Sequence, residues 1–394
     1  PDTRGRPSRV PTGGPGGIHP VGCDRLAEMT DPLLPDYSGA CVTGVVPTLL
    51  DPSGEVPDWM PQELVGANQV ALLVLDGLGW DQLEERAHLA PTLTSLPRTP
   101  ITTVCPTTTA TALTSITTGL SPGAHGVIGS RIAIQRQILN VLRWSTPRGD
   151  ARESIVPSGV QPHEAFGSER PPVITRAEFI ATGFTEAHLQ PSRFEGYRMP
   201  STMVVEVAQT LRRGEPFLYA YYDGIDKVAH EYGLGEHYDA ELMAVDQMVR
   251  AIVAGLPQGA ALVVTADHGQ VQVGNNVIEP AREVLSMVDF QSGEGRFRWF
   301  HARPGATAEL AAACAERYGD QAWVVTRTQT IDEGWWGPGL TDSAAACLGD
   351  VALVAREPVA FSDPADTGPF VLQSRHGSLT SAEVLVPLIV ARGG

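Results

Sequence analysis

Three short apolar runs in this chain each lead into an acidic residue, and this repeated pattern limits the folds that it can adopt. Residues 69–75 (QVALLVL) precede Asp76, residues 217–223 (FLYAYYD) lead into Asp226, and residues 261–269 (ALVVTADHG) contain Asp267. Such a run followed by a Gly-containing turn is typical of a buried parallel strand that meets its loop. Helical spacing follows these runs, so the alternation predicts one large α/β unit with its functional residues at the ends of the strands.

The composition of the chain limits the class of protein it can be and the kinds of partner it can bind. The chain has 394 residues, 42% of them hydrophobic, which is enough for a large core. A formal net charge of −17 makes a nucleic-acid polymer or an anionic membrane surface a poor partner, whereas a small phosphorylated substrate needs only a locally positive site. We therefore expect a small phosphorylated substrate, with no nucleic acid and no membrane. The sequence carries no prediction of the oligomeric state.

The cysteines and the chain's apolar runs bear on its compartment. The five cysteines are scattered and show no CxxC spacing, which favours a reducing environment over a disulfide framework: Cys23, Cys41, Cys105, Cys314 and Cys347. No run approaches ~20 consecutive apolar residues, and the first residues lack the apolar centre of a secretory signal. The sequence predicts a soluble, cytoplasmic protein.

Patterning along the chain predicts its organisation. Residues 1–28 are rich in Pro, Gly and Arg and are expected to be a disordered extension. Residues 29–394 are expected to form a single catalytic domain, interrupted by insertions at about 127–200 and 275–370. The first insertion is expected to determine substrate selectivity, and the second is expected to form a small αβ cap. A helix is expected over residues 109–118, closed by Gly119.

Acids and imidazoles gather at the expected strand ends. Asp226 and His230 are four residues apart, so on a helix they face the same ion, and Asp267 and His268 follow a strand directly. Each motif alone could be a turn, a helix cap or a solvated surface group, but their combination favours metal binding. Mixed nitrogen and oxygen ligands favour zinc, with manganese or iron as alternatives. Two such ions about 4 Å apart can clamp the attacking and leaving oxygens of a displacement at phosphorus.

The ordered set of motifs resembles the alkaline phosphatase superfamily, and within it the nucleotide pyrophosphatase/phosphodiesterase branch. The resemblance covers roughly residues 65–392 and rests on LVLDGLG, PTTTATALTSITTG, LSPGAHGVIG, DGIDKVAH, VVTADHG and RHGSLT. It implies an alkaline-phosphatase-like three-layer αβα sandwich with a mainly parallel central sheet and small inserted caps. It also implies two Zn²⁺ ions, one bound by Asp226, His230 and His376. The residues expected at the other ion are Asp76, Asp267 and His268, with Thr109 as the activated nucleophile.

The mechanism that the resemblance implies is attack of Thr109 on phosphorus to give a phosphothreonine, which is then hydrolysed. Thr109 lies ten residues before Gly119, as the nucleophile does in the family, and Thr108 is the alternative nucleophile. The implied activity is that of a phosphodiesterase or nucleotide pyrophosphatase, and the substrate could be a nucleotide.

Two departures from the family pattern leave other substrates open. Ser130 stands where the branch usually has Asn, and Arg131 beside it could bind a dianionic phosphate bidentately, so both are candidate substrate-binding residues. Ala110 replaces the aromatic residue that follows the nucleophile in relatives that hydrolyse nucleotides. A phosphomonoesterase and a phosphonate hydrolase of the same superfamily are therefore the alternatives.

Other classes fit the sequence less well. A sulfatase needs a C-x-P-x-R type string, whereas the chain has Cys105 directly before Pro106. A phosphoglycerate mutase relative would be expected to use serine and manganese. A catalytically inactive protein that binds a phosphorylated ligand is the alternative from another class, but an inactive relative normally loses some ligands and this chain keeps the full set.

Overall fold

Strand β1 (Gln69–Leu75) lies in the middle of a seven-stranded sheet in the computed structural model, which describes residues 31–51, 54–366 and 371–394. Its Val, Leu and Ala side chains are buried from Val70 to Leu75, as expected for a strand that is covered on both faces. In sheet order the strands are β2 (Arg98–Thr102), β19 (Leu385–Arg392), β10 (Ala260–Thr265), β1, β9 (Phe217–Tyr222), β7 (Pro172–Arg176) and β8 (Arg193–Tyr197).

Strand direction brings the loops of the site together. β1 is parallel to both β9 and β10, with Leu75 opposite Tyr222 and Val74 opposite Thr265. The carboxyl ends of these three strands therefore meet at one edge of the sheet. β19 runs antiparallel to β10 and to β2, so the sheet is mainly parallel.

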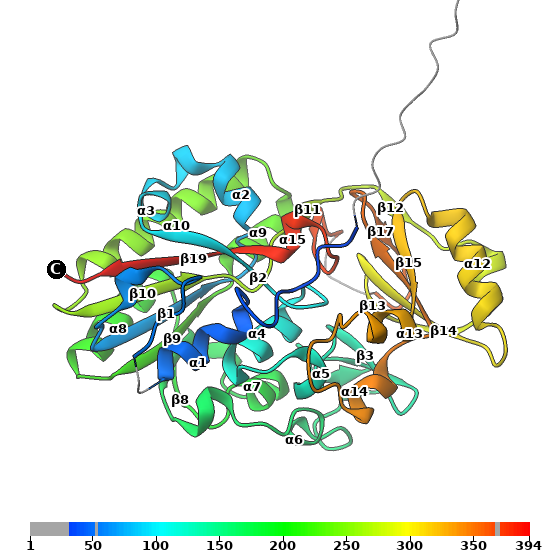
Figure 1. Ribbon diagram of the computed structural model, residues 1–394, viewed down its shortest axis with the longest axis horizontal. Coiled ribbons are helices and arrows are strands. Elements are labelled where there is room, and N and C mark those ends of the chain that lie inside the picture. Colours follow the sequence, from blue (N-terminus) through cyan, green and yellow to red (C-terminus); the bar gives the residue numbers. More distant parts are fainter. Residues whose placement is uncertain (1–30, 52–53, 367–370) are drawn as a thin grey trace, which may run out of the picture. The chain divides into compact units, whose positions relative to one another are not determined.

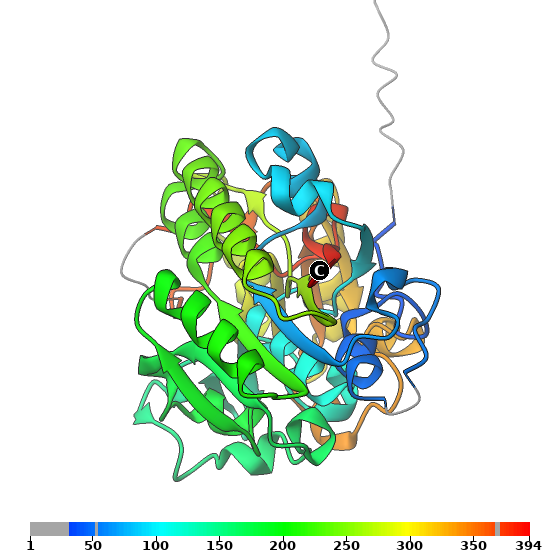
Figure 2. The same ribbon diagram turned by 90° about the vertical axis from the view of Figure 1, so that its left-hand side faces the viewer.

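Helices cover both faces of the central sheet within the compact unit Pro32–Gly394 (Figures 1 and 2). On one face lie α2 (Trp80–Glu85), α3 (Pro91–Ser95), α8 (Pro200–Arg212), α9 (Gly224–Tyr232) and α10 (Glu236–Ala254). On the other lie α1 (Val45–Leu50), α4 (Thr109–Thr118), α5 (Pro122–His125) and α7 (Gly183–His188). The predicted three-layer αβα sandwich with a mainly parallel sheet is confirmed.

The segment 127–200 contributes to the central sheet as well as to a separate subdomain. Its second half supplies β7 and β8, which extend the sheet in parallel beyond β9. The part outside the sheet is thus residues 127–171, narrower than the insertion expected from the sequence. It contains β3 (Arg131–Ile134), β4 (Gln137–Asn140), β5 (Ser145–Thr146), β6 (Gly149–Asp150) and α6 (Pro157–Val160).

Residues 275–366 form a second subdomain with its own apolar cluster, which includes Phe300, Leu310, Val351 and Phe361. Its antiparallel sheet has the order β13 (Val288–Glu294), β14 (Phe297–Ala302), β16 (Val351–Ala355) and β15 (Ala322–Thr326). Its helices are α11 (Arg282–Leu285), α12 (Thr307–Tyr318), α13 (Arg327–Asp332) and α14 (Asp342–Cys347). Figure 1 shows this region from yellow to orange.

Two short pairs of strands lie where the chain enters and leaves this subdomain. β11 (Val271–Gln272) pairs with β18 (Ser374–Arg375) just outside it, and β12 (Val277–Ile278) pairs with β17 (Ala360–Phe361) within it. Helix α15 (Ser381–Val384) then leads into β19. The chain thus returns to the central sheet through the loop that carries His376.

Two further sequence predictions concern residues 1–28 and membrane-spanning segments. The predicted disordered extension, residues 1–28, lies outside the described residues. Among the helices of the described ranges, none has the length and apolar character that a membrane crossing requires.

Candidate active site

Asp76, Asp267 and His268 follow directly from two adjacent central strands. The backbone N–H of Asp76 continues the ladder of β1 by donating to the carbonyl of Tyr222 at 2.9 Å. The Asp267 carboxylate folds back over its own loop, where its Oδ1 accepts from the amides of Gly77 and His268, each at 3.0 Å. These bonds fix the direction of the Asp267 side chain and leave its Oδ2 free to face the site.

Asp226, His230 and His376 lie on the opposite side of the same edge. The first turn of α9 is tied to the β1 loop, because the amide of Asp226 donates to the carbonyl of Asp76 at 3.1 Å. The Nε2 atoms of His230 and His376 lie 3.3 and 3.8 Å from Asp226 Oδ1. The residues of both predicted ligand trios therefore converge, although 300 positions of sequence separate Asp76 from His376.

All three imidazoles have one ring nitrogen held by a backbone carbonyl. Nδ1 of His230 lies 2.7 Å from the carbonyl oxygen of Ser374, that of His268 lies 3.0 Å from Gly269, and that of His376 lies 2.8 Å from Thr107. A carbonyl can only accept, so each Nδ1 carries the proton and each Nε2 presents a lone pair to the site. This arrangement is the usual support of a metal-binding histidine.

The ligand atoms form two overlapping groups. One comprises Asp226, His230 and His376, the other Asp76, Asp226 and His268, and within each the ligand atoms lie within 4.8 Å of one another. Asp226 belongs to both groups, whereas the sequence assigned it to one. Asp267 flanks the second group, with its Oδ2 3.5 Å from His268 Nε2.

The two groups differ in their access to solvent. Asp226, His230 and His376 have side chains that are 13%, 19% and 11% exposed. Asp76 is 4% exposed, and His268 and Asp267 are fully buried. The first group therefore lies nearer to solvent than Asp76, His268 and Asp267 do.

Two carboxylate oxygens of the site have no partner in the described part of the chain. Asp76 Oδ1 and Asp267 Oδ2 are buried there without a hydrogen bond. Burial and the neighbouring carboxylates of Asp267 and Asp226 hold the pKa of Asp76 well above its usual range, and burial likewise raises the pKa of Asp267. Burial and the imidazoles of His268 and His230 hold the pKa of His376 well below its usual value. Buried carboxylates and neutral imidazoles that share one space fit cations, which would supply the missing positive charge.

Helix α4 presents Thr109 to this cluster. The helix runs from Thr109 to Thr118 and ends at Gly119 in the left-handed conformation (φ 71°), which confirms the predicted helix. It is buried on all sides up to Thr117, and hydroxyls such as that of Thr114, which donates to the Ala110 carbonyl at 2.7 Å, find partners within the helix.

The two candidate nucleophiles point in different directions. Thr109 Oγ1 lies 3.1 Å from His268 Nε2, so it faces the point toward which the ligand atoms converge. Thr108, the N-cap residue, instead contacts the Ser130 hydroxyl through its own Oγ1. The geometry therefore favours Thr109 over Thr108.

The two predicted substrate-binding residues have different surroundings. Ser130 lies beside the N-terminus of α4 through its contact with Thr108. The guanidinium of Arg131 is paired with Asp363, at 3.1 Å, and with Asp366. Its charge is therefore already engaged by carboxylates of the second subdomain.

Several site residues were not identified from the sequence. The Tyr221 hydroxyl donates to Asp76 Oδ2, and burial holds its pKa well above the usual range, so it stays protonated. Gln270 donates to Asp226 Oδ1 at 2.5 Å and accepts from the Ser374 hydroxyl at 2.5 Å. Gln270 follows the ADHG string directly, but an amide at a strand end has no distinctive local signal.

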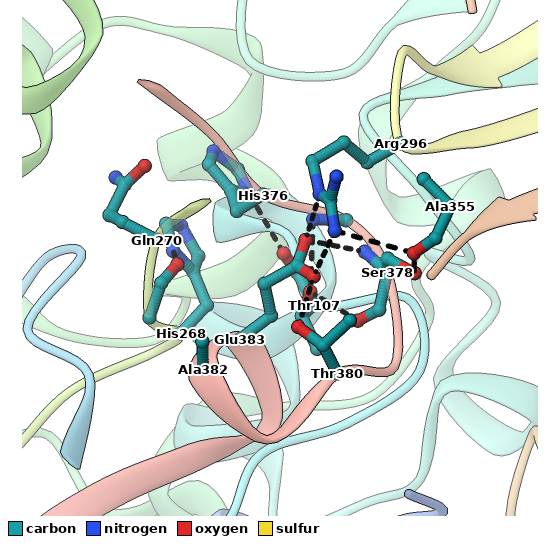
Figure 3. A network of polar contacts seen from close by, with 12 residues as sticks. Thr107, His268, Gln270, Arg296, Ala355, His376, Ser378, Thr380, Ala382 and Glu383 are labelled. Carbon is teal, nitrogen blue, oxygen red and sulfur yellow. Dashed lines mark hydrogen bonds and ion pairs between the residues drawn. The ribbon is translucent and has the colours of Figure 1, made fainter. Parts of the chain in front are cut away.

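A buried ion pair supports the His376 loop (Figure 3). Arg296 and Glu383 are both fully buried and joined twice, at 2.7 and 2.8 Å. Glu383 also accepts from the Ser378 amide at 3.0 Å, and the Ser378 carbonyl accepts from Thr107, whose own carbonyl holds His376. The pair thus connects the second subdomain to an imidazole of the site.

A cavity of about 240 Å³ adjoins the cluster and reaches Asp76, Thr109 and Asp226. Apolar side chains form much of its wall: Leu113, Leu142, Phe179, Phe184, Leu189 and Tyr219. Such a wall suits an uncharged organic group next to the charged site.

Comparison with known families extends this picture. The family model described as type I phosphodiesterase / nucleotide pyrophosphatase matches residues 70–363. A search of curated proteins finds no match to this sequence.

Solved structures with the same fold come from animals and a bacterium. Murine ectonucleotide pyrophosphatase/phosphodiesterase 5, in an inactive form in complex with AMP, is 15% identical with a TM-score of 0.62, over 82% of this chain and 88% of that chain. Phosphonoacetate hydrolase from Sinorhizobium meliloti 1021, in complex with phosphonoacetate, is 18% identical with a TM-score of 0.61, over 84% and 91% of the two chains. Human ectonucleotide pyrophosphatase/phosphodiesterase 5 is 14% identical with a TM-score of 0.61, over 82% of this chain and 87% of that chain. At these identities the likeness concerns the fold.

Proposed function

Because the chain belongs to the type I phosphodiesterase/nucleotide pyrophosphatase family of the alkaline phosphatase superfamily, we propose that it hydrolyses phosphodiesters at a two-zinc site through a phosphothreonine at Thr109. The family assignment gives a phosphoric ester hydrolase. We further propose that the metal is zinc, that the nucleophile is Thr109 and that the substrate is a diester.

One observation carries the proposal: a threonine at the start of a buried helix points into a cluster of buried carboxylates and oriented imidazoles. Thr109 Oγ1 and the Nε2 atom of His268 lie 3.1 Å apart, and His230 and His376 also direct Nε2 inward. The proposed ligands of one ion are Asp226, His230 and His376, and those of the other are Asp76, Asp267 and His268, with Thr109 and a shared Asp226. Bound zinc would lower the pKa of a coordinated hydroxyl and offset the charge of phosphoryl oxygens.

The roles of the chain's own groups follow from this placement. Thr109 Oγ1 forms a bond to phosphorus as the bond to the leaving oxygen breaks, which releases an alcohol and leaves the other ester group on the threonine-bound phosphoryl group. Water then breaks the bond between Thr109 Oγ1 and phosphorus, releases a phosphomonoester and restores the threonine hydroxyl. The free amides at the N-terminus of α4 face the transferred group and stabilise its negative charge. The cavity of about 240 Å³ receives an organic part of the substrate.

A phosphonate hydrolase is the second candidate, because phosphonoacetate hydrolase shares the fold. The apolar cavity wall favours an ester with an organic leaving group over a small charged phosphonate. The AMP complex of the murine relative makes nucleotides reasonable diester substrates to test. The cytoplasmic location predicted from the cysteines stays a prediction.

The proposal is tested by metal analysis together with kcat/KM for bis-p-nitrophenyl phosphate, p-nitrophenyl phosphate and phosphonoacetate. We expect two zinc ions per chain and the highest kcat/KM for the diester. Thr109→Ala should keep zinc and lose about 10³-fold or more of the activity, because it removes the nucleophile.

Three matched variants sharpen this test. Thr108→Ala should retain most activity, and Thr109→Ser should retain part of it, since serine keeps a hydroxyl at the same position. Asp226→Ala should lose metal and activity together, because Asp226 belongs to both ligand groups. Full activity of Thr109→Ala, or no turnover of any substrate by the zinc-loaded protein, would contradict the proposal.

A further inference from the structure

Glu294 brings a carboxylate of the second subdomain to the start of helix α4. It is the last residue of β13, and both of its carboxylate oxygens lie 3.4 Å from the backbone nitrogen of Ser130. The Ser130 hydroxyl in turn contacts Thr108, the residue before the proposed nucleophile. Glu294 is intermediate in exposure, so part of its surface remains accessible. Ser130 therefore links the Glu294 carboxylate to the residue directly before Thr109.

The cations around Glu294 are engaged elsewhere. Arg131 and Arg298 pair with Asp363 and Asp366 of the same subdomain. Within the described ranges, neither arginine forms an ion pair with Glu294. The positive charges of both arginines are therefore already paired with aspartates in the absence of substrate.

The remaining charged and titratable neighbours do not pair with Glu294 either. Arg296 is bound by Glu383, and Arg375 directs Nη1 toward the position of Gly295. Burial, and to a lesser extent the charge of Glu294, hold the pKa of the Cys105 thiol well above the usual range. The hydrogen bonds of Glu294 are thus with neutral groups around Ser130.

The pKa of Glu294 lies near neutral pH. Burial raises the pKa of Glu294 to about 7, against the opposing effects of the Ser130 amide, Arg298 and Arg131. An acid whose folded-state pKa is raised is neutral below that value and anionic above it. Glu294 therefore changes from a neutral group to an anion as the pH rises through about 7.

We propose that Glu294 selects substrates by charge: its carboxylate disfavours a dianionic phosphomonoester or phosphonate at Thr109 relative to a monoanionic phosphodiester. A phosphomonoester carries close to two negative charges above about pH 6, whereas a diester carries one. Repulsion between like charges in a partly desolvated site penalises the dianion more. The inference rests on the proposed function and names the substrate class of that site.

The test is the ratio of kcat/KM for bis-p-nitrophenyl phosphate to that for p-nitrophenyl phosphate, in the zinc-loaded wild type and in Glu294→Gln at about pH 8. The amide keeps the size of the side chain and can still accept from Ser130. The ratio should fall by about tenfold, because monoester turnover rises while diester turnover changes little. A ratio measured on one preparation does not depend on the folded fraction, so a general loss of stability would not produce this result.

Two controls and a binding measurement complete the experiment. Glu294→Asp keeps the charge and should keep the preference for the diester, and Glu309→Gln, an exposed residue of α12, should leave the ratio unchanged. Inorganic phosphate, measured by titration calorimetry at about pH 8, should bind Glu294→Gln about tenfold more tightly than the wild type. This difference should shrink at about pH 6, where the wild-type carboxyl is protonated.

The outcomes separate the inference from the proposed function. Normal diester turnover with an unchanged ratio and unchanged phosphate affinity in Glu294→Gln would overturn the role of Glu294 alone. Absence of turnover of both esters by the zinc-loaded wild type would overturn the proposed function and this inference with it.

Discussion

At the scale of single residues, Tyr221 supports one carboxylate oxygen of the site. Its hydroxyl donates to Asp76 Oδ2, while Oδ1 has no protein partner. Removing a residue that orients a metal ligand typically lowers metal affinity by about 10–100-fold. We therefore expect Tyr221→Phe to raise the zinc concentration needed for half-maximal activity by about that factor, measured with zinc buffers.

The next residue provides a matched control. The Tyr222 hydroxyl donates to Glu241 at 2.6 Å, away from the ligand cluster. Tyr222→Phe removes the same atom and should leave zinc affinity unchanged. Equal zinc affinity in Tyr221→Phe and in the wild type would show that this hydroxyl does not support the metal site.

The site residues also differ in whether the sequence alone could identify them. Asp226 with His230, and Asp267 with His268, are recognisable because each pair is adjacent or one helical turn apart. Tyr221 and Gln270 were missed because their partners, Asp76 and Asp226, lie 145 and 44 positions away. Gln270 lies beside the recognisable Asp267 and His268, but an amide in that position has no distinctive pattern of its own.

At the scale of elements, the Arg296–Glu383 pair joins the turn after β13 to helix α15. Both side chains are fully buried, so removing one partner leaves a charge without compensation, which typically costs about 3–5 kcal/mol. Glu383→Gln should lower the unfolding temperature and also weaken zinc binding, because Ser378 is hydrogen-bonded to Thr107 and the Thr107 carbonyl holds His376. Calorimetry and zinc analysis on the same samples would measure both effects.

A surface pair gives the comparison. Arg213 and Glu195 lie 3.0 Å apart with side chains that are 48% and 29% exposed. Such pairs contribute little to stability, so Arg213→Met should change neither the unfolding temperature nor the zinc content noticeably. A Glu383→Gln protein with normal zinc affinity would show that the pair supports the fold without supporting His376.

Elements also differ in how well the sequence predicts them. β1 and β10 were predictable because both are continuous apolar runs buried in the sheet. β7 and β8 were read as part of an insertion, because they are short and lie toward one edge of the sheet. Much of β8 remains exposed, so its side chains carry no continuous apolar pattern.

At the scale of the whole molecule, the stability of the protein should depend on metal and on pH together. Zinc that binds only the folded chain stabilises it by about 4 kcal/mol when its free concentration is about a thousand times Kd. Without metal, the raised pKa values of Asp76 and Asp267 mean that the folded state holds protons that the unfolded state has released. Their destabilising contribution is therefore largest at high pH and diminishes as pH falls through the raised values.

Chelation should accordingly lower the unfolding temperature more at about pH 8 than at about pH 5.5. Zinc affinity also falls at the lower pH, because the ligands must lose their protons to bind. Scanning calorimetry with and without a chelator measures the difference, and Asp226→Ala serves as the control that should show little response to zinc. An equal effect of chelation at both pH values would contradict the assignment of buried carboxylates to the metals.

The place of β19 in the central sheet has a consequence for biosynthesis. This strand, residues 385–392, lies between β2 and β10, and the loop of His376 precedes it directly. A nascent chain therefore keeps two unpaired strand edges open until nearly all of these residues have left the ribosome. Such edges can pair with other chains, so stalled or shortened products should be prone to aggregation before any metal can bind.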